Sequence, residues 1–261
     1  MNTDSEISLG DRMKMYESSE SKSLNMELPI LVRLDGRHFH TFTRGLNRPF
    51  DERLSECMYS ATKAVLAETN GVIGYTQSDE ITIVILPTSQ MLFSGRIQKL
   101  CSSLAALASV VFMKKASELL PPKYADKLPT FDCRVWNVPN LMEAANAVLW
   151  RELDAEKNSI ASLAQSLFST KELHGAHGGL MKEMVLEKGK SWDNLPVHFQ
   201  RGIYCKKITT NGPLSVKELS LLPPKHHAHS NPEMIVSRSR IERVEFPRLI
   251  SITNKVDLLF N

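Results

Sequence analysis

The first half of the chain alternates short apolar runs with longer segments in which apolar residues recur at helical spacing. The run LPILVRL, entered at Pro29, predicts a strand. The segment NRPFDERLSECMYSATKAVLAETNG predicts an amphipathic helix that begins at an Asp51 N-cap and stops at Asn70-Gly71. The apolar face of this helix comprises Leu54, Cys57, Met58, Ala61 and Val65.

Two more strands, a second helix and a fourth strand are predicted downstream. GVIGYTQSDEITIVIL has two apolar runs on either side of Thr76 to Glu80, which indicates a hairpin with ITIVIL as its second strand. FSGRIQKLCSSLAALASVVFMKKASELLPP predicts a long helix capped by Ser94 and ended before Pro121, and TFDCRVWNVP predicts another strand. The order β-α-β-β-α-β predicts an α/β protein of the α+β type, in which an antiparallel split βαβ sheet carries both helices on one face.

The second half predicts a helical and strand-bearing extension. We expect residues 1–138 to form one domain, and residues 139–261 to form a helical region and C-terminal arm packed with it as one unit. Helices are predicted between residues 140 and 188, and strands at GIYCKKI and ISIT. The segment 209–233 indicates a loop or flexible arm. Its His226, His227 and His229 lack a suitably spaced carboxylate or cysteine, which favours a solvated loop over a metal site.

Acidic residues from two predicted strands are expected to meet at one edge of the sheet. The third strand of a split βαβ sheet lies antiparallel beside the first, so Asp35 should lie near Asp79 and Glu80. Alone, Asp-Gly is also typical of a turn, and Ser-Asp-Glu of a solvated loop. Mg²⁺ prefers one or two carboxylates plus phosphate oxygens, and a pair of ions promotes displacement at phosphorus. The convergence therefore predicts a two-magnesium site at Asp35 and Asp79.

Residues that follow the first acid could hold a polyphosphate. Gly36 allows close approach of the backbone, and the amides of residues 37–40 could cradle a triphosphate. Arg48, Arg96 and Lys99 are candidate phosphate partners, although each also fits an ordinary surface cation.

Composition adds few constraints. The 261 residues carry a net charge of +3, which is compatible with a polyanionic partner. The four cysteines are far apart and predict reduced core thiols. The N-terminal segment has no apolar core, and no run of about 18 apolar residues occurs, so we expect a cytoplasmic protein without a signal peptide or membrane span.

Several arginines and tryptophans have two possible interpretations, contact with RNA or a structural role. The arginines at 238, 240, 243 and 248 could contact RNA phosphates or form a charged strand face. Trp136, Trp150 and Trp192 could stack on a base, but the apolar neighbours of the first two favour core packing.

Five motifs together resemble a known family. RLDGRHFHTF, NRPFDERL, YTQSDEITIVI, SGRIQKL and FDCRVWNVP are similar to successive motifs of tRNA-His guanylyltransferases and guanylyltransferase-like proteins, which extend tRNA at its 5′ end. The resemblance spans about residues 29–207. It implies a polymerase palm-like domain, two Mg²⁺ on Asp35, the Gly36 carbonyl and Asp79, and a catalytic supporting role for Glu80. The expected nucleotide-binding residues are Arg37, His38, Phe39, His40, Arg48, Ser78, Arg96, Lys99, Asn158 and Lys182.

The resemblance also implies a reaction and partners. ATP would adenylylate a 5′-monophosphate RNA end, and the 3′-hydroxyl of GTP or another nucleoside triphosphate would then displace AMP. We expect tRNA as the partner and a homo-tetramer. The family's eukaryotic branch has a His-Ile-Asn-Asn block where this chain has Glu156, Lys157, Asn158 and Ser159, which favours the bacterial, archaeal and phage branch and templated tRNA repair. A palm-fold nucleotidyl cyclase and an inactive nucleotide- or RNA-binding module are the alternatives.

Overall fold

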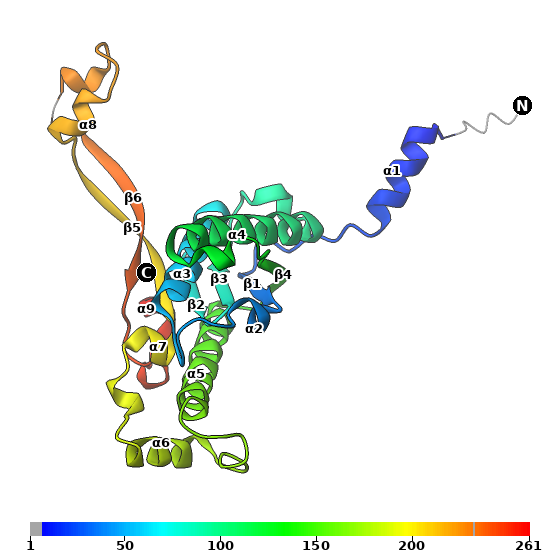
Figure 1. Cartoon of the computed structure of the whole chain (residues 1–261). Coiled ribbons are helices and arrows are strands. Elements are labelled where there is room, and N and C mark those ends of the chain that lie inside the picture. Colours follow the sequence, from blue (N-terminus) through cyan, green and yellow to red (C-terminus); the bar gives the residue numbers. More distant parts are fainter. Residues whose placement is uncertain (1–6, 232) are drawn as a thin grey trace, which may run out of the picture.

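A single antiparallel sheet organises the chain. The computed structural model describes residues 7–231 and 233–261, and its six strands lie in the order β4-β1-β3-β2-β5-β6 (Figure 1). The first four have the predicted split βαβ order, with β1 antiparallel to both β3 and β4, so the predicted fold class is confirmed. The strands are β1 (Ile30–Arg37), β2 (Ile73–Gln77), β3 (Glu80–Ile85), β4 (Thr130–Asn137), β5 (Ile203–Pro213) and β6 (Ile235–Val244).

Two long helices cover one face of the sheet. Helix α3 (Glu52–Thr69) begins at Asp51, whose carboxylate accepts a 3.0 Å hydrogen bond from the Arg53 amide, and ends at left-handed Asn70, as predicted. Helix α4 (Ile97–Leu119) follows η1 (Leu92–Gly95). The predicted Ser94 cap of α4 is wrong, because Ser94 lies inside η1 and the Ile97 amide donates to the Lys22 carbonyl.

A membrane span is a poor description of α4. It is the one helix in the described chain that is long and apolar enough to cross a membrane. One side of it is buried against α3 and the sheet, however, which is the arrangement of a core helix. The buried positions on α4 are Leu100, Leu104, Ala108, Phe112 and Ala116.

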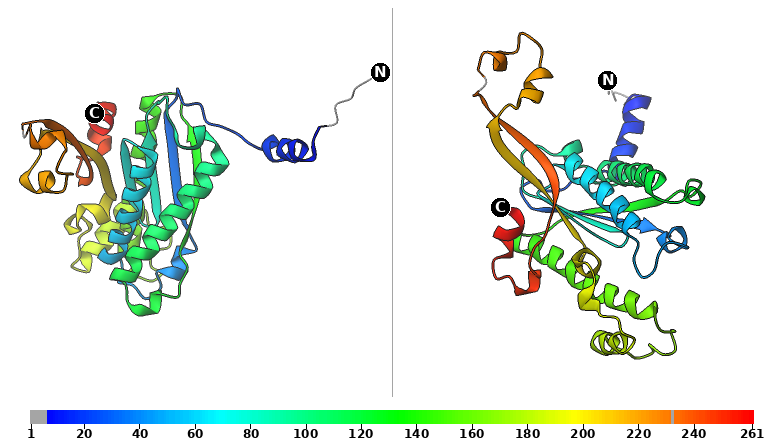
Figure 2. Two further views of the ribbon diagram at one scale, coloured as in Figure 1. Left: turned by 90° about the horizontal axis from the view of Figure 1, so that it is seen from above. Right: turned by 60° about the vertical axis from the view of Figure 1, so that its left-hand side comes forward.

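The opposite face is covered by the second half of the chain (Figure 2). Helix α5 (Leu141–Gln165) and the terminal α9 (Lys255–Phe260) pack on Leu31, Tyr75 and Val84 of the sheet. The end of α5 packs with α6 (Gly178–Glu187) and η3 (Trp192–Asn194), and α7 (Val197–Arg201) leads into β5. The proposed division at residues 138 and 139 stays a prediction, and residues 1–6 lie outside the described part.

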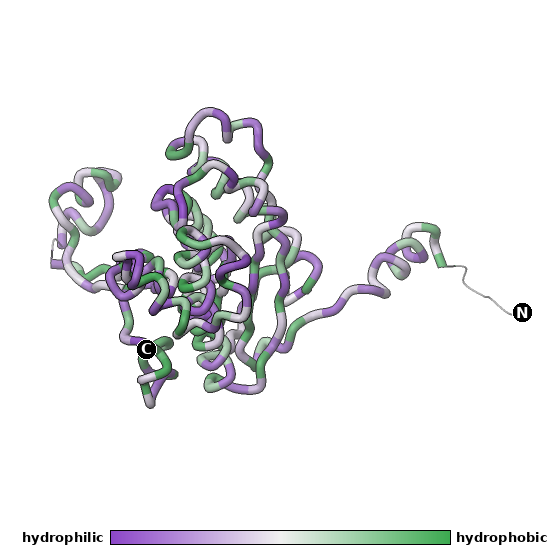
Figure 3. Tube along the Cα trace, turned by 60° about the horizontal axis from the view of Figure 1, so that its bottom comes forward, coloured by the Kyte–Doolittle hydropathy of each residue, from purple (hydrophilic) through white to green (hydrophobic). Residues whose placement is uncertain are grey.

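Two segments project from the body of the molecule (Figure 1). Helix α1 (Leu9–Ser19) stands apart, its hydrophilic and hydrophobic positions alternate (Figure 3), and none of its described side chains is buried. The β5–β6 hairpin carries α8 (Val216–Ser220) and η4 (His227–His229) at its tip. The predicted irregular segment 209–233 is therefore partly wrong, because β5 continues to Pro213; its Pro232 lies outside the described residues.

Three local predictions fail because of tertiary contacts. The ISIT strand is wrong: this region forms η5 (Leu249–Ser251), where the Leu249 amide donates to the Glu152 carboxylate at 2.8 Å. Trp136 and Trp150 are 37% and 56% exposed, so their predicted core packing is wrong. Trp192 is the buried one, and its indole N–H donates to Ser159 Oγ at 2.9 Å.

The four cysteines are free thiols in the described chain, and Cys57 and Cys205 are buried.

Candidate active site

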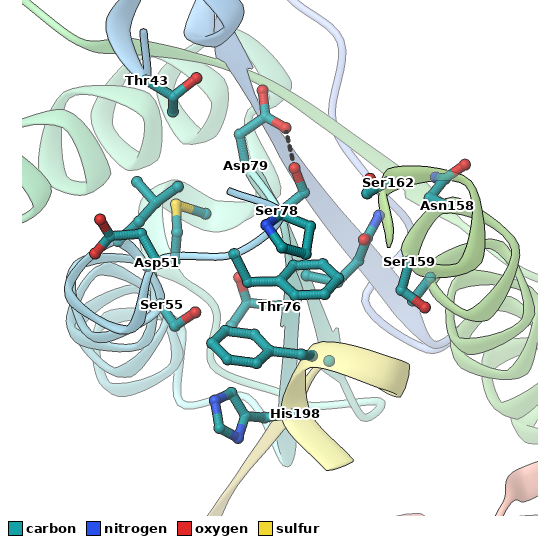
Figure 4. A pocket seen from close by; sticks show the side chains of 18 of the residues that line it. Thr43, Asp51, Ser55, Thr76, Ser78, Asp79, Asn158, Ser159, Ser162 and His198 are labelled. Atoms are coloured by element: carbon teal, nitrogen blue, oxygen red, sulfur yellow. Dashed lines mark hydrogen bonds between the residues drawn. The ribbon is translucent and has the colours of Figure 1, made fainter. Parts of the chain in front are cut away.

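A cavity of about 490 Å³ lies where β2 turns into β3, between α3, α5 and α7 (Figure 4). Asp51 and Ser55 line it from α3 and its cap, and Asn158, Ser159 and Ser162 from α5. Thr76 comes from β2, Ser78 and Asp79 come from the turn between β2 and β3, and His198 comes from α7. Phe50 and Phe199 also line it and stack on each other, with ring centroids 4.7 Å apart and planes at 13°. The cavity thus combines an aromatic surface with many hydrogen-bonding groups and one end rich in carboxylates.

The sheet brings the three predicted acids together at that end. Asp35 and Glu80 are paired across β1 and β3, and the Gly36 amide donates to the Asp79 carbonyl at 3.0 Å. Paired residues of an antiparallel ladder place their side chains on the same face, here the α5 face. The predicted strand order therefore has the expected geometric consequence, while the chemical roles of these residues stay predictions.

The Asp79 carboxylate is poorly compensated. It follows Ser78, which has a left-handed backbone (φ 50°) and donates from Oγ to Asp79 Oδ1 at 3.0 Å. Burial raises the pKa of Asp79 above its ordinary value, and the charge of Asp35 raises it further, although the Ser78 hydrogen bond opposes this. Within the described residues Asp79 has no ion-pair partner. A bound cation would stabilise both carboxylates here.

Glu80 is in a different position, because both of its oxygens are already bonded. Arg33 bonds Oε1, and Arg151 Nη2 lies 2.5 Å from Oε2. Arg33 also lies 3.2 Å from Asp35, and Arg151 lies 2.7 Å from Asp154. Burial raises the pKa of Glu80, and the two arginines oppose that rise. Glu80 is thus held by two ion pairs, whereas Asp35 and Asp79 are the less compensated carboxylates at this end of the cavity.

The donor set fits magnesium better than a closed metal cage. In residues 7–231 and 233–261, no group of three His, Cys, Asp or Glu side chains is arranged to hold an ion. Two carboxylates, a main-chain carbonyl and oxygens from a phosphate would suffice for Mg²⁺, which keeps few protein ligands. The residues present therefore fit the predicted ions.

The predicted nucleotide-binding residues divide into two groups. Arg48, Ser78 and Asn158 line the cavity together with Asp79 and Glu80. The others lie outside its lining: Arg37, His38, Phe39, His40, Arg96, Lys99 and Lys182.

Two of the residues outside the lining have evident structural roles. The Phe39 side chain is 2% exposed and packs against Phe112 and Phe131 in the core, so only its backbone is free to contact a nucleotide. Lys182 Nζ lies 3.7 Å from the centroid of the Trp192 ring and 3.4 Å from Asp193, so it belongs to the α6 region.

The sequence did not point to several residues that shape this site. The stacked Phe50 and Phe199 are far apart in the chain, and no local pattern indicates their contact. Arg33 and Arg151 were also missed. The only available signal was the spacing of Arg151 and Asp154, which suits an ion pair on one helix face.

An antiparallel sheet that presents paired carboxylates beside a cavity with an aromatic surface suits a transferase that acts on nucleotides, because it offers ligands for a divalent cation and a surface for a base. A family profile described as tRNAHis guanylyltransferase matches residues 10–139. The structure is similar to a bacterial tRNA(His) guanylyltransferase-like protein in complex with ATP, which is 39% identical with a TM-score of 0.72 over 76% of this chain and 88% of that one. A second such bacterial structure, in complex with GTP, is 31% identical with a TM-score of 0.72 over 94% of both chains.

A viral protein is similar as well. An uncharacterized protein of Acanthamoeba polyphaga mimivirus is 28% identical over 224 residues, which cover 76% of this chain and 77% of that protein. The chain belongs to the tRNAHis guanylyltransferase family and is a nucleotidyltransferase.

Proposed function

We propose that this enzyme adds nucleotides to the 5′ end of tRNA in the 3′-to-5′ direction, with ATP and GTP as substrates and Mg²⁺ as cofactor. The observation that carries this proposal is the meeting of Asp35 and Asp79 at one edge of the sheet, beside the 490 Å³ cavity. The two bacterial relatives in complex with ATP and with GTP support the choice of nucleotides.

The metal site would use the sheet edge. Asp35, Asp79 and the Gly36 carbonyl would hold the ions, and bound Mg²⁺ would activate the attacking oxygen and neutralise phosphate charge. Arg33 and Arg151 hold Glu80 and keep its charge from adding to the repulsion between the other two acids.

The cavity would hold the nucleotide. Phe50 and Phe199 would offer an aromatic surface for a base, and Arg48 and Asn158, which line the same cavity, would contact phosphate or ribose oxygens. In the first step a 5′-phosphate oxygen of the RNA attacks the α-phosphate of ATP, and pyrophosphate leaves. In the second, the 3′-hydroxyl of the incoming nucleotide attacks the activated 5′-phosphate, and AMP leaves. Positioning and charge compensation supply most of the rate in such reactions.

The sequence of α5 supports templated repair over obligatory guanylate addition, because it lacks the block expected of the eukaryotic branch. Glu156 and Ser159 occupy places where the eukaryotic block is expected. Glu156 pairs with Arg248 at 2.6 Å, and Ser159 Oγ donates to the Gln200 carbonyl at 3.0 Å while it accepts from Trp192. These two side chains bind α5 to later segments of the chain, and the residues of that block that line the cavity are Asn158 and Ser159.

The test is extension of a 5′-truncated RNA. A 5′-monophosphorylated tRNA that lacks its first nucleotide is incubated with Mg²⁺, ATP, labelled nucleoside triphosphates and enzyme, a 5′-triphosphorylated tRNA is incubated in parallel to bypass the activation step, and products are resolved by gel. Addition of one nucleotide chosen by the opposing base supports the proposal. Cyclic nucleotide formed without RNA would instead indicate a cyclase, and absence of both products would indicate an inactive binding module.

The setting of the reaction is also proposed. We infer that the enzyme acts in the cytoplasm as a homo-tetramer. Sedimentation at several protein concentrations measures the assembly directly, and a monomer throughout the range would contradict it.

A further inference from the structure

A second cavity, of about 620 Å³, lies between α3 and the β5–β6 hairpin. We call it the basic groove; its principal lining residues are Tyr59, Lys63, Lys115, Lys207, Arg240 and Ile241. The active-site cavity is lined by Asp51, Leu54, Ser55 and Met58, at the start of α3, whereas the basic groove is lined by the part of α3 from Glu56 to Asn70. The two cavities therefore take their lining from successive residues of one helix, on different faces of it.

The α3 wall of the groove is one helix face. Tyr59, Lys63 and Asn70 recur at intervals of three or four residues or their multiples, so their side chains point to the same side. Lys63 has no ion-pair partner within the described chain, and its ammonium lies 5.8 Å from the centroid of the Tyr59 ring. This wall thus offers an aromatic ring and an available cation.

The hairpin forms the opposite wall. Lys207 and Ile241 are paired across β5 and β6 and face α3, where the Lys207 ammonium donates to Asn70 Oδ1 at 2.9 Å. Arg243 lies on the same face, with its guanidinium carbon 4.3 Å from the centroid of the Tyr59 ring. Tyr59 is therefore flanked by cations from both walls.

The charges of this region are available to a ligand. Arg240 pairs with Glu242, Lys115 with Glu118 and Arg243 with Glu56, but all three pairs are at least one-third exposed. Exposed pairs contribute little and exchange partners readily. Residues 203–244 contain seven lysines and arginines against three glutamates, although the whole chain carries only +3. The positive charge of the protein is thus concentrated on the hairpin.

We propose that the basic groove binds the phosphodiester backbone of the tRNA substrate while the 5′ end of that RNA occupies the active-site cavity. This proposal rests on the proposed function. An excess of cations beside an aromatic ring suits nucleic acid, and α3 lines both cavities, so an RNA held in the groove would cross the first half of α3 to reach the acids. A second copy of this chain is the competing occupant, and it would have to bring carboxylates to the groove.

The test is a charge-removing variant, Lys63→Gln/Lys115→Gln/Lys207→Gln, in the full-length protein. Its matched control is Lys171→Gln/Lys188→Gln/Lys190→Gln, which removes the same charge from exposed positions near α6. Binding to a fluorescent 5′-truncated tRNA is measured by anisotropy from 50 to 300 mM KCl. We expect the groove variant to bind at least about tenfold more weakly, with a salt slope smaller by about two, and the control to stay near wild type.

Other outcomes separate the alternatives. Equal affinity of the groove variant and its control would overturn the proposal. Sedimentation of both variants tests whether a second copy of the chain occupies the groove. That would be the case if only the groove variant dissociated into smaller assemblies, and if its loss of tRNA affinity disappeared at protein concentrations that restore the assembly. ATP affinity, measured by calorimetry without RNA, should be the same in all three proteins. The wild-type protein could bind tRNA through the groove and yet extend no RNA. This result would refute the proposed function but would still support the groove as a tRNA-binding site.

Discussion

Asp35 and Glu80 lie opposite each other across β1 and β3, and one guanidinium, that of Arg33, bonds both carboxylates. The second oxygen of Glu80 is held by Arg151, whereas the one contact of Asp35 with Arg33 is 3.2 Å long. Two neighbouring acids thus differ in how completely they are neutralised. We therefore predict that Glu80 supports the ends of these strands and that Asp35, with Asp79, binds the cation.

The Arg151→Met variant should be strongly destabilised. Arg151 is 5% exposed and pairs with both Glu80 and Asp154, so its loss leaves a partly buried carboxylate without one of its two cations. Removing one partner of such a pair costs about 3 kcal/mol. Urea denaturation monitored by circular dichroism measures the change in the free energy of unfolding.

Arg240→Met is the matched control, because Arg240 pairs with Glu242 at 2.7 Å but its side chain is 68% exposed. We expect a change below about 1 kcal/mol for this variant. Equal losses in the two proteins would show that the Arg151 network does not stabilise the fold.

The Gly36→Ala variant should disturb both stability and activity. A Cβ at this position would lie 2.6 Å from Cγ of Phe39, whose ring is held by Phe112 and Phe131 and cannot move freely. Overpacking of this kind costs about 1–3 kcal/mol, and the end of β1 that carries Asp35 must shift. Thermal unfolding and the extension assay measure the two effects.

The control is Gly10→Ala on α1, where the nearest atom, Ser8 Oγ, would be 3.9 Å from the new Cβ. That variant should unfold at the same temperature as the wild type. A fully active and stable Gly36→Ala enzyme would mean that this strand end has more freedom than its packing indicates.

The meeting of Asp35 and Glu80 at the ends of two central strands could be predicted from the sequence, because strand order follows from local patterns. Alternating strands and helices specify a split βαβ sheet, and antiparallel pairing of its first and third strands then brings Asp35 to Glu80. No local pattern specifies that α5 crosses the other face of the sheet at the height of Glu80. The Arg151 contact, 71 residues away in sequence, could therefore not be foreseen.

The burial of Trp150 and Trp192 likewise could not be predicted from local sequence. Apolar neighbours suggested that Trp150 is buried, but α5 turns this residue outward and Arg151 covers its ring, with the guanidinium carbon 4.4 Å from the ring centroid. Trp192 is buried because the chain after α6 returns to α5, where Ser159 accepts its N–H. Both outcomes depend on how distant segments pack, which residue character alone does not determine.

Asp51 should make stability depend on pH in the acidic range. The Arg53 side chain and the amides of Asn47 and Arg53 bond this carboxylate and lower its pKa to about 2 from 3.8. The folded-state pKa is below the unfolded one, so the stabilisation is present above pH 4 and is lost as the pH falls towards 2. Asp51→Ala also removes the α3 N-cap and should lose about 1–2 kcal/mol at pH 7.

Asp51→Asn is the informative control, because asparagine is also a good N-cap. It should be less destabilised than Asp51→Ala at pH 7, and its stability difference from the wild type should shrink between pH 4 and pH 2. Urea titrations at these pH values measure both quantities, and a difference that does not vary with pH would contradict the role of the Asp51 charge.

The Asp79→Asn variant should lose activity without losing stability. Burial raises the pKa of Asp79 in the folded protein above its value in the unfolded chain. The protonated carboxyl therefore contributes to folding stability below the unfolded-state pKa, and this contribution disappears as the pH rises through the folded-state pKa. At pH 7 and without divalent ions, asparagine should therefore be tolerated at least as well as the charged carboxylate. Mg²⁺ should raise the unfolding temperature of the wild type but not of Asp79→Asn, and extension should fall at least about 100-fold. Full extension activity in a folded Asp79→Asn enzyme would refute the proposed metal site.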